Sequence, residues 1–348
     1  MKQIDRSELY KKALEAYRTQ RKFTLFRKPE DDILQLYIDE QEQSSSRNHF
    51  LIGSFNHDHI IRIHPNQIFY TKTTSHSKCM TKVKAAKPRL QENPSDEYTE
   101  MIKITLKLFC SNSLKKIVLS RVKRIPFRKF ALKTSFENLL RTHPESFVNL
   151  WNDPDHGLWM GATPELLFKT KNKKLRSVAL AGTLSLDDSA TTWTFKELEE
   201  HHMVIKNISN ILENYLGKTS IERTKTLITG RLRHLQTPIE GSFSETPDLQ
   251  SLLHALHPTP AICGLPRKSA LDFILKHEGY DRTFYTGYMG PIYKDNAELY
   301  VNLRCAKIFR EEIALYVGSG VTAQSNPEKE WIEAENKAQN TLSQLCFR

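Results

Sequence analysis

The stretch 147-FVNLWNDPDHGLWMGATPELLFKTKNKKLRSV-178 decides the expected fold. It holds four short runs rich in apolar and β-forming residues, at 147–151, 157–160, 166–170 and 175–178. Asp-Pro, Gly and Asn-Lys turns separate these runs, and such turns between short apolar runs are typical of strands that follow one another through tight connections. We therefore predict an antiparallel meander in this part of the chain.

Outward from this meander, helical and extended patterns alternate without strict β-α-β order. Apolar residues at helical spacing predict helices at 5–20, 95–109, 134–142, 194–215, 248–256, 267–277 and from 327 to the end. Extended patterns predict strands at 33–38, 49–55, 116–121, 231–237, 284–290, 298–308 and 312–317. Helices mixed with hairpin-joined strands favour an α+β fold with mainly antiparallel sheet. The Thr-, Ser-, Lys- and Pro-rich stretch 71–97 predicts a surface loop or insertion.

Composition excludes several classes of protein. The 348 residues are 39% hydrophobic and 26% charged, so the chain can bury a core and is not a disordered, low-hydrophobicity chain. Its length is compatible with one domain or two. The 51 Lys and Arg exceed the 40 Asp and Glu by 11, but they are spread along the chain without a basic tail. This distribution favours a solvated basic surface and predicts no nucleic-acid partner.

Cysteine usage and apolar runs predict a cytoplasmic protein that does not enter a membrane. The five cysteines are widely separated and form no C-x-x-C pair, which indicates neither a disulfide framework nor a zinc knuckle. No run of 18 apolar residues occurs, and the first residues are charged rather than an apolar signal core.

Two pairs of glutamates carry the first chemical signal. Glu197 with Glu200, and Glu330 with Glu333, stand three residues apart on predicted helices. Positions three apart share one helix face, so each pair points at one place. Brought together, the two faces would form an anionic, oxygen-rich site suited to Mg²⁺. Taken alone, either pair is usually the solvated surface of a helix.

The segment Gly318-x-Gly320-x-x-Ala323 allows two interpretations. It matches a dinucleotide-binding fingerprint only weakly, because a Rossmann unit needs a further strand and an acidic residue about twenty positions on. We interpret it as a glycine-rich loop before the last helix, where free amides can bind a carboxylate. Three histidine pairs, 57/59, 201/202 and 254/257, lack zinc spacing and favour structural roles over a transition-metal site.

Eight motifs in a fixed order resemble a known family. They are KIVLSR from Lys116, MGATPE ending at Glu165, ALAGT at 179–183, ELEEHH at 197–202, HPTPAICGLPR at 257–267, FYTGYMG at 284–290, VNLRCAK at 301–307 and GSG at 318–320 with NPEKEWIEAENK at 326–337. Together they resemble the chorismate-utilising enzymes, and among them the isochorismate synthases. The resemblance covers about residues 105–348, and residues 1–100 carry little of it. It implies one large domain, 1–348, of stacked, mainly antiparallel sheets flanked by helices.

The resemblance implies an acid and a base. Isochorismate formation adds water at C2 of chorismate and expels the C4 hydroxyl, so the site needs a base on one ring face and an acid near the leaving oxygen. Lys116 matches the family's base and Glu165 its acid. Burial would favour the neutral form of both groups. The plainer alternatives are that Lys116 is an exposed residue at a strand end and that Glu165 caps the next element.

The same resemblance implies the binding residues. Glu200 and Glu333 match the principal Mg²⁺ ligands, with Glu197 and Glu330 acting directly or through water. Tyr285 and Arg304 match positions that bind the enolpyruvyl carboxylate. The ring carboxylate is held in the family by positions matching Thr183, Gly318, Gly320 and Lys337, and His257 matches a position close to the substrate.

Several features narrow the choice among family members. Lys116 favours water over ammonia as the nucleophile, so we expect no amidotransferase subunit. We also expect a monomer, which is the usual state of the synthases that the chain resembles. A salicylate synthase, which goes on to eliminate pyruvate from isochorismate, shares these positions and remains an alternative. A catalytically silent, basic binding protein is a second alternative. The sequence leaves the pathway open between menaquinone, a siderophore and salicylate.

Overall fold

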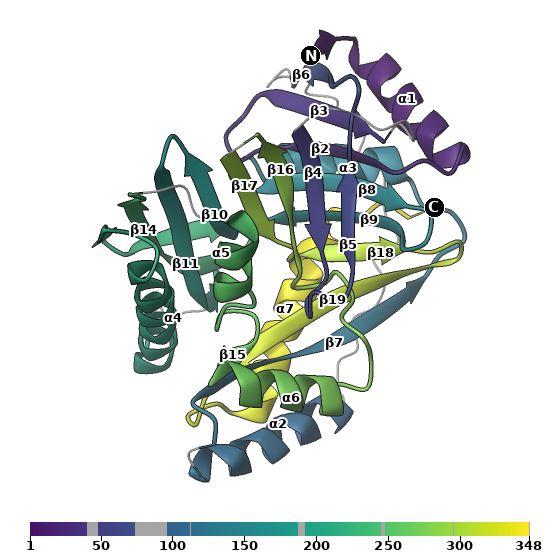
Figure 1. The fold of residues 1–348 in the computed structure, drawn as a ribbon. Coiled ribbons are helices and arrows are strands. Elements are labelled where there is room, and N and C mark those ends of the chain that lie inside the picture. The colour runs from purple at the N-terminus through teal and green to yellow at the C-terminus, as the bar shows by residue number, and fades with distance from the viewer. Residues whose placement is uncertain are drawn as a thin grey trace.

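Two large sheets, sheet 1 and sheet 2, form the body of the computed structural model (Figure 1). The structure describes residues 1–39, 48–73, 96–111, 113–186, 192–244, 248–294 and 296–347. In the described ranges β1 pairs with β6 in parallel, and every other strand pair is antiparallel. The predicted α+β class with mainly antiparallel sheets is therefore confirmed.

The order of the strands across each sheet differs from their order along the chain. Sheet 1 runs β1 (Lys2–Gln3), β6 (Phe69–Lys72), β3 (Ile33–Ile38), β2 (Phe23–Arg27), β8 (Phe147–Asp153), β9 (Gly157–Thr163), β18 (Cys305–Ile308), β19 (Glu312–Val321), β7 (Lys116–Pro126) and β15 (Gly264–Leu265). Sheet 2 runs β12 (Lys218–Ile221), β14 (Leu232–Ser242), β11 (Lys174–Ser185), β10 (Leu166–Lys171), β17 (Asn296–Val301), β16 (Tyr288–Tyr293), β4 (Asn48–Gly53) and β5 (Ile60–Ile63), with β13 (Lys225–Thr229) also paired to β14.

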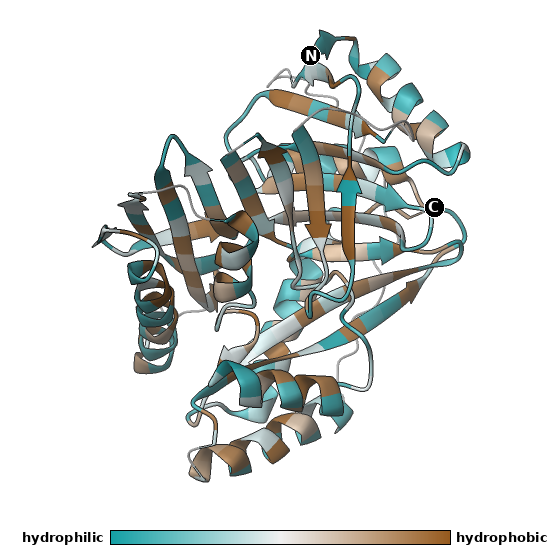
Figure 2. Ribbon diagram, viewed as in Figure 1, coloured by the Kyte–Doolittle hydropathy of each residue, from teal (hydrophilic) through white to brown (hydrophobic). Residues whose placement is uncertain are grey.

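Aromatic side chains fill the layer where the two sheets meet. Phe26 and Trp159 of sheet 1 and Phe50 and Tyr300 of sheet 2 are buried in one cluster. The rings of Phe147 and Tyr300 stack across the layer at 4.4 Å between centroids. Buried aromatic rings remove large apolar areas from water, so this layer holds the sheets face to face. The strands facing it are the brown segments near the centre of Figure 2.

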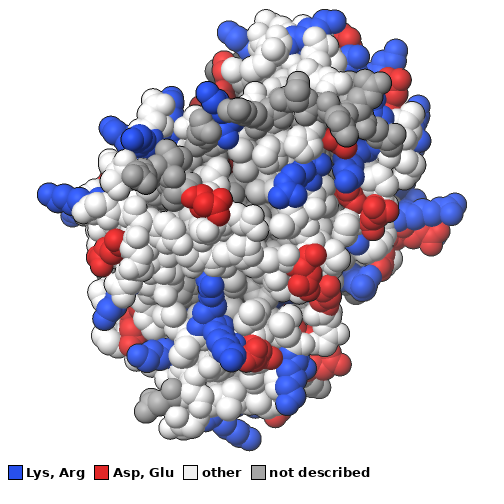
Figure 3. Space-filling view, in the orientation of Figure 1, with Lys and Arg blue, Asp and Glu red and all other residues white. Residues whose placement is uncertain are grey.

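Helices cover the remaining faces. The helices α1 (Arg6–Arg18), α2 (Asp96–Cys110), α3 (Leu132–Thr142), α6 (Arg267–His277) and α7 (Pro327–Leu342) pack on sheet 1. Sheet 2 is covered by α4 (Phe195–Glu213), which also contacts α5 (Leu249–Leu256). No helix in the described part of the chain is long and apolar enough to cross a membrane. On the face seen in Figure 3, basic and acidic side chains are interspersed.

The predicted helices correspond to these seven, but several predicted strands need correction. The stretch 298–308 is not one strand, because β17 belongs to sheet 2 and β18 to sheet 1. The meander of 147–178 is divided in the same way, with β8 and β9 in sheet 1 and β10 and β11 in sheet 2. A strand begins at Tyr288 rather than at Phe284. Local periodicity identifies an extended segment but not the sheet in which it pairs, which explains the first two errors.

Of the two predicted loops, the one at 71–97 is mostly untested and the glycine-rich one at 318–320 is wrong. Most of the predicted loop at 71–97 lies outside the described residues, since 74–95 are not described. Gly318 and Gly320 do not form a loop but lie inside β19, opposite Ser120 and Val118 of β7. The sequence pattern also missed β2, which pairs with β3 and β8.

Two of the points at which the chain passes from one sheet to the other are adjacent, and we call these two the sheet crossings: residues 163–166 and 302–304. The Thr163 hydroxyl donates to the carbonyl of Val301 at 2.6 Å, and the amide of Val301 donates to the carbonyl of Glu165 at 3.0 Å. Glu165 and Arg304 are thus brought together although 139 positions separate them in sequence. The candidate site is built around these crossings.

Candidate active site

Lys116, the first residue of β7, is completely buried. Its ammonium Nζ lies 3.0 Å from Oε1 of Glu200 on α4. The neighbouring Lys115 is exposed, so strand alternation directs one lysine inward and the other to solvent. The alternative of an exposed Lys116 at a strand end is therefore excluded.

Glu165 follows Pro164 at the first crossing and is also buried. Burial raises the pKa of its carboxyl to about 8, although the positive charges of Lys116 and Lys337 act in the opposite direction. The side chain therefore holds its proton at neutral pH. This is the protonation state that a general acid requires.

A cavity of about 100 Å³ opens between Glu165 and the second crossing. Most predicted binding residues line it: Glu165, Thr183, Glu200, Tyr285, Arg304, Gly318, Gly320 and Lys337. Residues from both sheets and from α4 and α7 contribute to this lining. Predicted residues that do not line it are Lys116, Glu197, His257, Glu330 and Glu333.

Arg304 supplies a buried positive charge to the cavity. One guanidinium nitrogen donates to the hydroxyl of Thr229 at 2.5 Å, and the other donates to Nε2 of His234. Burial lowers the pKa of Arg304 to about 10, which still leaves it charged at neutral pH. Tyr285 lies against the same cavity with its ring stacked on Tyr316 at 5.3 Å between centroids.

His234 is a site residue that the sequence reasoning missed. Its Nε2 accepts from Arg304, so the ring proton is on Nδ1, within 3.2 Å of the Gly182 carbonyl and of the Thr183 hydroxyl. Burial, and then the charge of Arg304, lower the pKa of His234 well below its usual value, which keeps the ring neutral. The only local signal was a histidine in the predicted strand 231–237, a position that is typical of many structural histidines.

Gly318 and Gly320 allow the backbone of β19 to come close to other groups. A Cβ on Gly320 would lie 2.4 Å from Oε1 of Glu200, and one on Gly318 would lie 2.4 Å from the carbonyl of Leu119. The pairing of β18 with β19 ends at Leu315, so beyond it β19 has β7 on one side and the cavity on the other. Backbone groups along this edge can therefore face a substrate although no loop exists.

Substituting Gly320→Ala should destabilise the protein by roughly 1–3 kcal/mol, the usual range for overpacking a filled site. The new methyl group would push on the Glu200 carboxylate, which is itself paired with Lys116. Urea unfolding measures the change. Gly217→Ala is the matched control, because a Cβ there meets no atom within 4 Å. Equal stability of the two variants would contradict the packing argument.

The predicted metal carboxylates are each held by another group. Glu333 pairs with Lys337 at 2.7 Å, Glu330 pairs with Lys196, and Glu197 accepts from the Thr194 amide at 3.1 Å in a capping box that begins α4. No group of three or more His, Cys, Asp or Glu side chains within the described ranges is arranged to hold a metal ion. Glu197 in particular has a structural role in this arrangement.

Lys196, which the sequence reasoning also missed, lies near the three remaining predicted metal carboxylates, those of Glu200, Glu330 and Glu333. Burial alone would lower the pKa of Lys196, but the charges of Glu333, Glu330 and Glu200 raise it above its usual value. The Lys196 ammonium thus interacts electrostatically with all three carboxylates. Carboxylate oxygens are the ligands that a hard divalent cation such as Mg²⁺ takes, so these three glutamates are the residues that would hold one, although within the described ranges they are not grouped as a preformed metal site.

His257 lies behind the cavity wall rather than in it. Its Nε2 donates to the carbonyl of Thr286 at 2.8 Å, and Thr286 itself lines the cavity. Burial lowers the pKa of His257 to about 3, so the ring is neutral. The structure brings His57, His254 and His257 into contact, with ring centroids 4.4 and 4.9 Å from His57.

A buried acid, a buried lysine and a buried arginine around one cavity between two antiparallel sheets define an enzyme site for a small anionic substrate. Residues 33–346 match the family described as chorismate binding enzyme, and the chain belongs to this family. The match begins well before the residues 105–348 on which the sequence resemblance rested. The family predicted from the motifs is thus confirmed.

Curated relatives and solved structures agree with this assignment. The chain is 31% identical to the vibriobactin-specific isochorismate synthase of Vibrio cholerae over 73% of its length, and 30% identical to the isochorismate synthase MenF of Escherichia coli over 69%. It spans 68% and 58% of the lengths of these two proteins. The crystal structure of DhbC from Bacillus anthracis superposes with a TM-score of 0.80 at 25% identity, covering 97% of this chain and 99% of that one.

Proposed function

We propose that this protein is an isochorismate synthase, which converts chorismate to isochorismate by adding water at C2 and releasing the C4 hydroxyl. The observation that carries the proposal is the pair Glu165 and Lys116: Glu165 is buried and lines the cavity with Arg304, and Lys116 is buried against Glu200, which also lines it. The relatives named above are isochorismate synthases. A protein that only bound an anion would need neither a proton acceptor nor a neutral acid there.

Substrate binding follows from the placement of the charges. The enolpyruvyl carboxylate is bound by Arg304, whose planar guanidinium suits a carboxylate, and by the hydroxyl of Tyr285. His234 and Thr229 hold the guanidinium in place. The ring carboxylate lies toward Thr183, Lys337 and the free edge of β19 at Gly318 and Gly320.

The reaction then needs two proton transfers on the substrate ring. In its neutral amine form, Lys116 accepts a proton from the water that attacks C2. Glu165 donates its proton to the departing C4 hydroxyl, which leaves as water, and its raised pKa keeps that proton available at neutral pH. Enclosure of both groups by sheet 1, sheet 2 and α4 keeps the bulk solvent away from them.

We also propose that the enzyme uses Mg²⁺, held by Glu200 and Glu333 with Glu330 nearby. When bound there, the ion neutralises the ring carboxylate of the substrate. We further propose that the enzyme acts as a cytoplasmic monomer without an amidotransferase subunit and without a nucleic-acid or membrane partner. Water as the nucleophile supports the absence of an amidotransferase, because no ammonia has to be delivered.

The decisive experiment is to incubate the purified protein with chorismate, with and without Mg²⁺, and to separate the products by chromatography. Isochorismate at partial, reversible conversion is the expected result. Salicylate with an equal amount of pyruvate would make the protein a salicylate synthase. Unchanged chorismate would favour the silent binding protein.

Glu333→Gln should raise the Mg²⁺ concentration needed for half-maximal activity by about tenfold or more, as is common when a metal site loses a supporting group. The amide keeps the shape of the side chain but removes its charge. Isothermal calorimetry with Mg²⁺ gives a second readout that does not depend on turnover. Glu328→Gln, on the exposed side of the first turn of α7, is the control. An unchanged Mg²⁺ titration would reject the assignment.

A further inference from the structure

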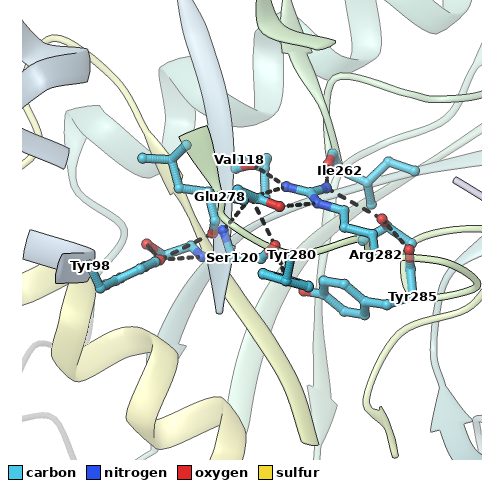
Figure 4. Close-up of polar contacts among 11 residues, drawn as sticks. Tyr98, Val118, Ser120, Ile262, Glu278, Tyr280, Arg282 and Tyr285 are labelled. Atoms are coloured by element: carbon cyan, nitrogen blue, oxygen red, sulfur yellow. Dashed lines mark hydrogen bonds and ion pairs between the residues drawn. The ribbon is translucent and has the colours of Figure 1, made fainter. Parts of the chain in front are cut away.

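A buried ion pair that the proposed mechanism does not use lies behind the cavity. The side chains of Arg282 and Glu278 are 2% and 0% exposed, and the guanidinium donates to both carboxylate oxygens at 2.5 and 2.7 Å (Figure 4). Taking two charges out of water is costly, and an apolar pair of similar volume often gives equal or greater stability. Stability alone therefore does not explain why this site contains an ion pair.

The other hydrogen bonds of Arg282 go to the cavity wall. It donates to the carbonyl of Val118 at 2.7 Å, to the carbonyl of Ile262 at 2.8 Å and to the hydroxyl of Thr286 at 3.3 Å. All three of these residues line the cavity, as does Tyr285 beside them. One guanidinium thus joins three segments of the wall that are far apart in sequence.

Glu278 completes the connection to β7. Its Oε1 accepts from the amide of Ser120 at 2.8 Å and from the Ser120 hydroxyl at 2.9 Å. The Ser120 hydroxyl also contacts the hydroxyl of Tyr280 at 2.6 Å. Figure 4 shows the two charged groups between β7 and the segment that carries Tyr285.

The ion pair lies on the edge of β7 that faces away from β19, at a place where this edge has no strand neighbour within the described ranges. β15 pairs only with Lys116 and Ile117. From Val118 onward, this edge of β7 is bonded instead to the Cys263 carbonyl, to Arg282 and to Glu278. The strand that carries Lys116 is therefore held at a fixed distance from the segment 284–287 by these two side chains.

We propose that Arg282, oriented by Glu278, is a positioning residue that fixes Tyr285 and the strand of Lys116 relative to each other. Arg282 touches no substrate and acts through Val118, Ile262 and Thr286. The inference rests on the proposed function, because Lys116 and Tyr285 are its base and its carboxylate ligand. A small misplacement of such groups can cost about a hundredfold in rate.

The test compares three variants with the wild type. Arg282→Met combined with Glu278→Leu replaces the ion pair by apolar groups. Arg282→Lys keeps the positive charge but loses the planar set of guanidinium N–H donors. Arg27→Lys is the matched control, since Arg27 is also buried and donates to the carbonyls of Leu140, His143 and Ser146, none of which lines the cavity. The measurements are kcat and KM for chorismate, the melting temperature, and amide hydrogen exchange.

We expect both Arg282 variants to lose about a hundredfold in kcat with less than a threefold change in KM. Amides of 117–120 and 284–287 should exchange faster in them but not in the Arg27 variant. The Arg27 variant should keep its kcat whatever its melting temperature. A kcat within threefold of the wild type in a folded Arg282 variant would overturn the proposal.

The wild-type reaction separates this inference from the proposed function. Wild-type protein that leaves chorismate unchanged would reject the proposed function by itself. Hydrogen exchange would then judge the positioning role alone, and unchanged exchange at 117–120 and 284–287 in Arg282→Lys would reject it. If the double variant fails to fold, the single Arg282→Lys variant carries the same comparison.

Discussion

Lys116→Ala should reduce isochorismate formation by about 10³-fold or more while chorismate binding remains measurable. Positioned general bases contribute roughly 10²–10⁴-fold to rates, and no other described lysine is placed in both β7 and the site. Chromatographic product assays give the rate, and calorimetric titration with chorismate gives the binding.

Two controls are needed for this variant. Removal of the ammonium leaves the Glu200 carboxylate without its partner, so the melting temperature of Lys116→Ala must be measured beside its activity. Lys115→Ala, on the exposed side next to the same strand, should behave like the wild type. Near-normal turnover by a folded Lys116→Ala protein would remove Lys116 from the mechanism.

Glu165→Gln should lower kcat by roughly 10²–10⁴-fold, because the amide has the shape of the acid but no acidic proton. The pH dependence provides a second, independent signature. Burial raises the pKa of Glu165 to about 8, so the active, protonated form is lost as the pH rises through that value. We expect the wild-type kcat to fall above about pH 8 and the residual rate of the variant to lack that decline.

The same pKa shift has a consequence for stability, with a defined sign. The carboxyl loses its proton near its ordinary pKa of 4.5 in the unfolded chain but near 8 in the folded protein. The contribution of the buried Glu165 carboxyl to the free energy of unfolding is therefore fully present below pH 4.5 and is lost as the pH rises toward 8. Urea unfolding across this range should show a smaller loss of stability in Glu165→Gln than in the wild type. If the free energy of unfolding changed with pH in the same way in both proteins, the argument that burial raises the pKa of Glu165 would be contradicted.

The sequence reasoning named residues that the structure brings to one cavity, but it did not predict the connections that bring them there. The apolar runs around Lys116 and the turn before Glu165 were enough to place both residues beside strands, because these are local patterns. The division of 298–308 between two sheets was missed, because it depends on pairing with strands that are distant in sequence. Arg304 owes its position to that division.

Residues that act through distant partners escaped the sequence reasoning altogether. His234 resembles any buried strand histidine until Arg304 is seen to donate to it. Lys196 resembles a surface lysine on a helix, and Arg282 a charge in a turn, until their partners on α7 and β7 are known. Gly318 and Gly320 were predicted to form a loop before the last helix, but they lie inside β19, where a Cβ on Gly320 would meet the Glu200 carboxylate.

The position of β19 between two other strands of sheet 1 has a consequence during protein synthesis. β19 lies between β18 and β7, and β7 leaves the ribosome long before β19 is translated. Until residues 312–342 emerge, the nascent chain carries Lys116 and Glu165 but lacks the glycine edge and Lys337 that complete the cavity. Prematurely terminated products should therefore be inert, and translation must pass α7 before any chorismate can be turned over.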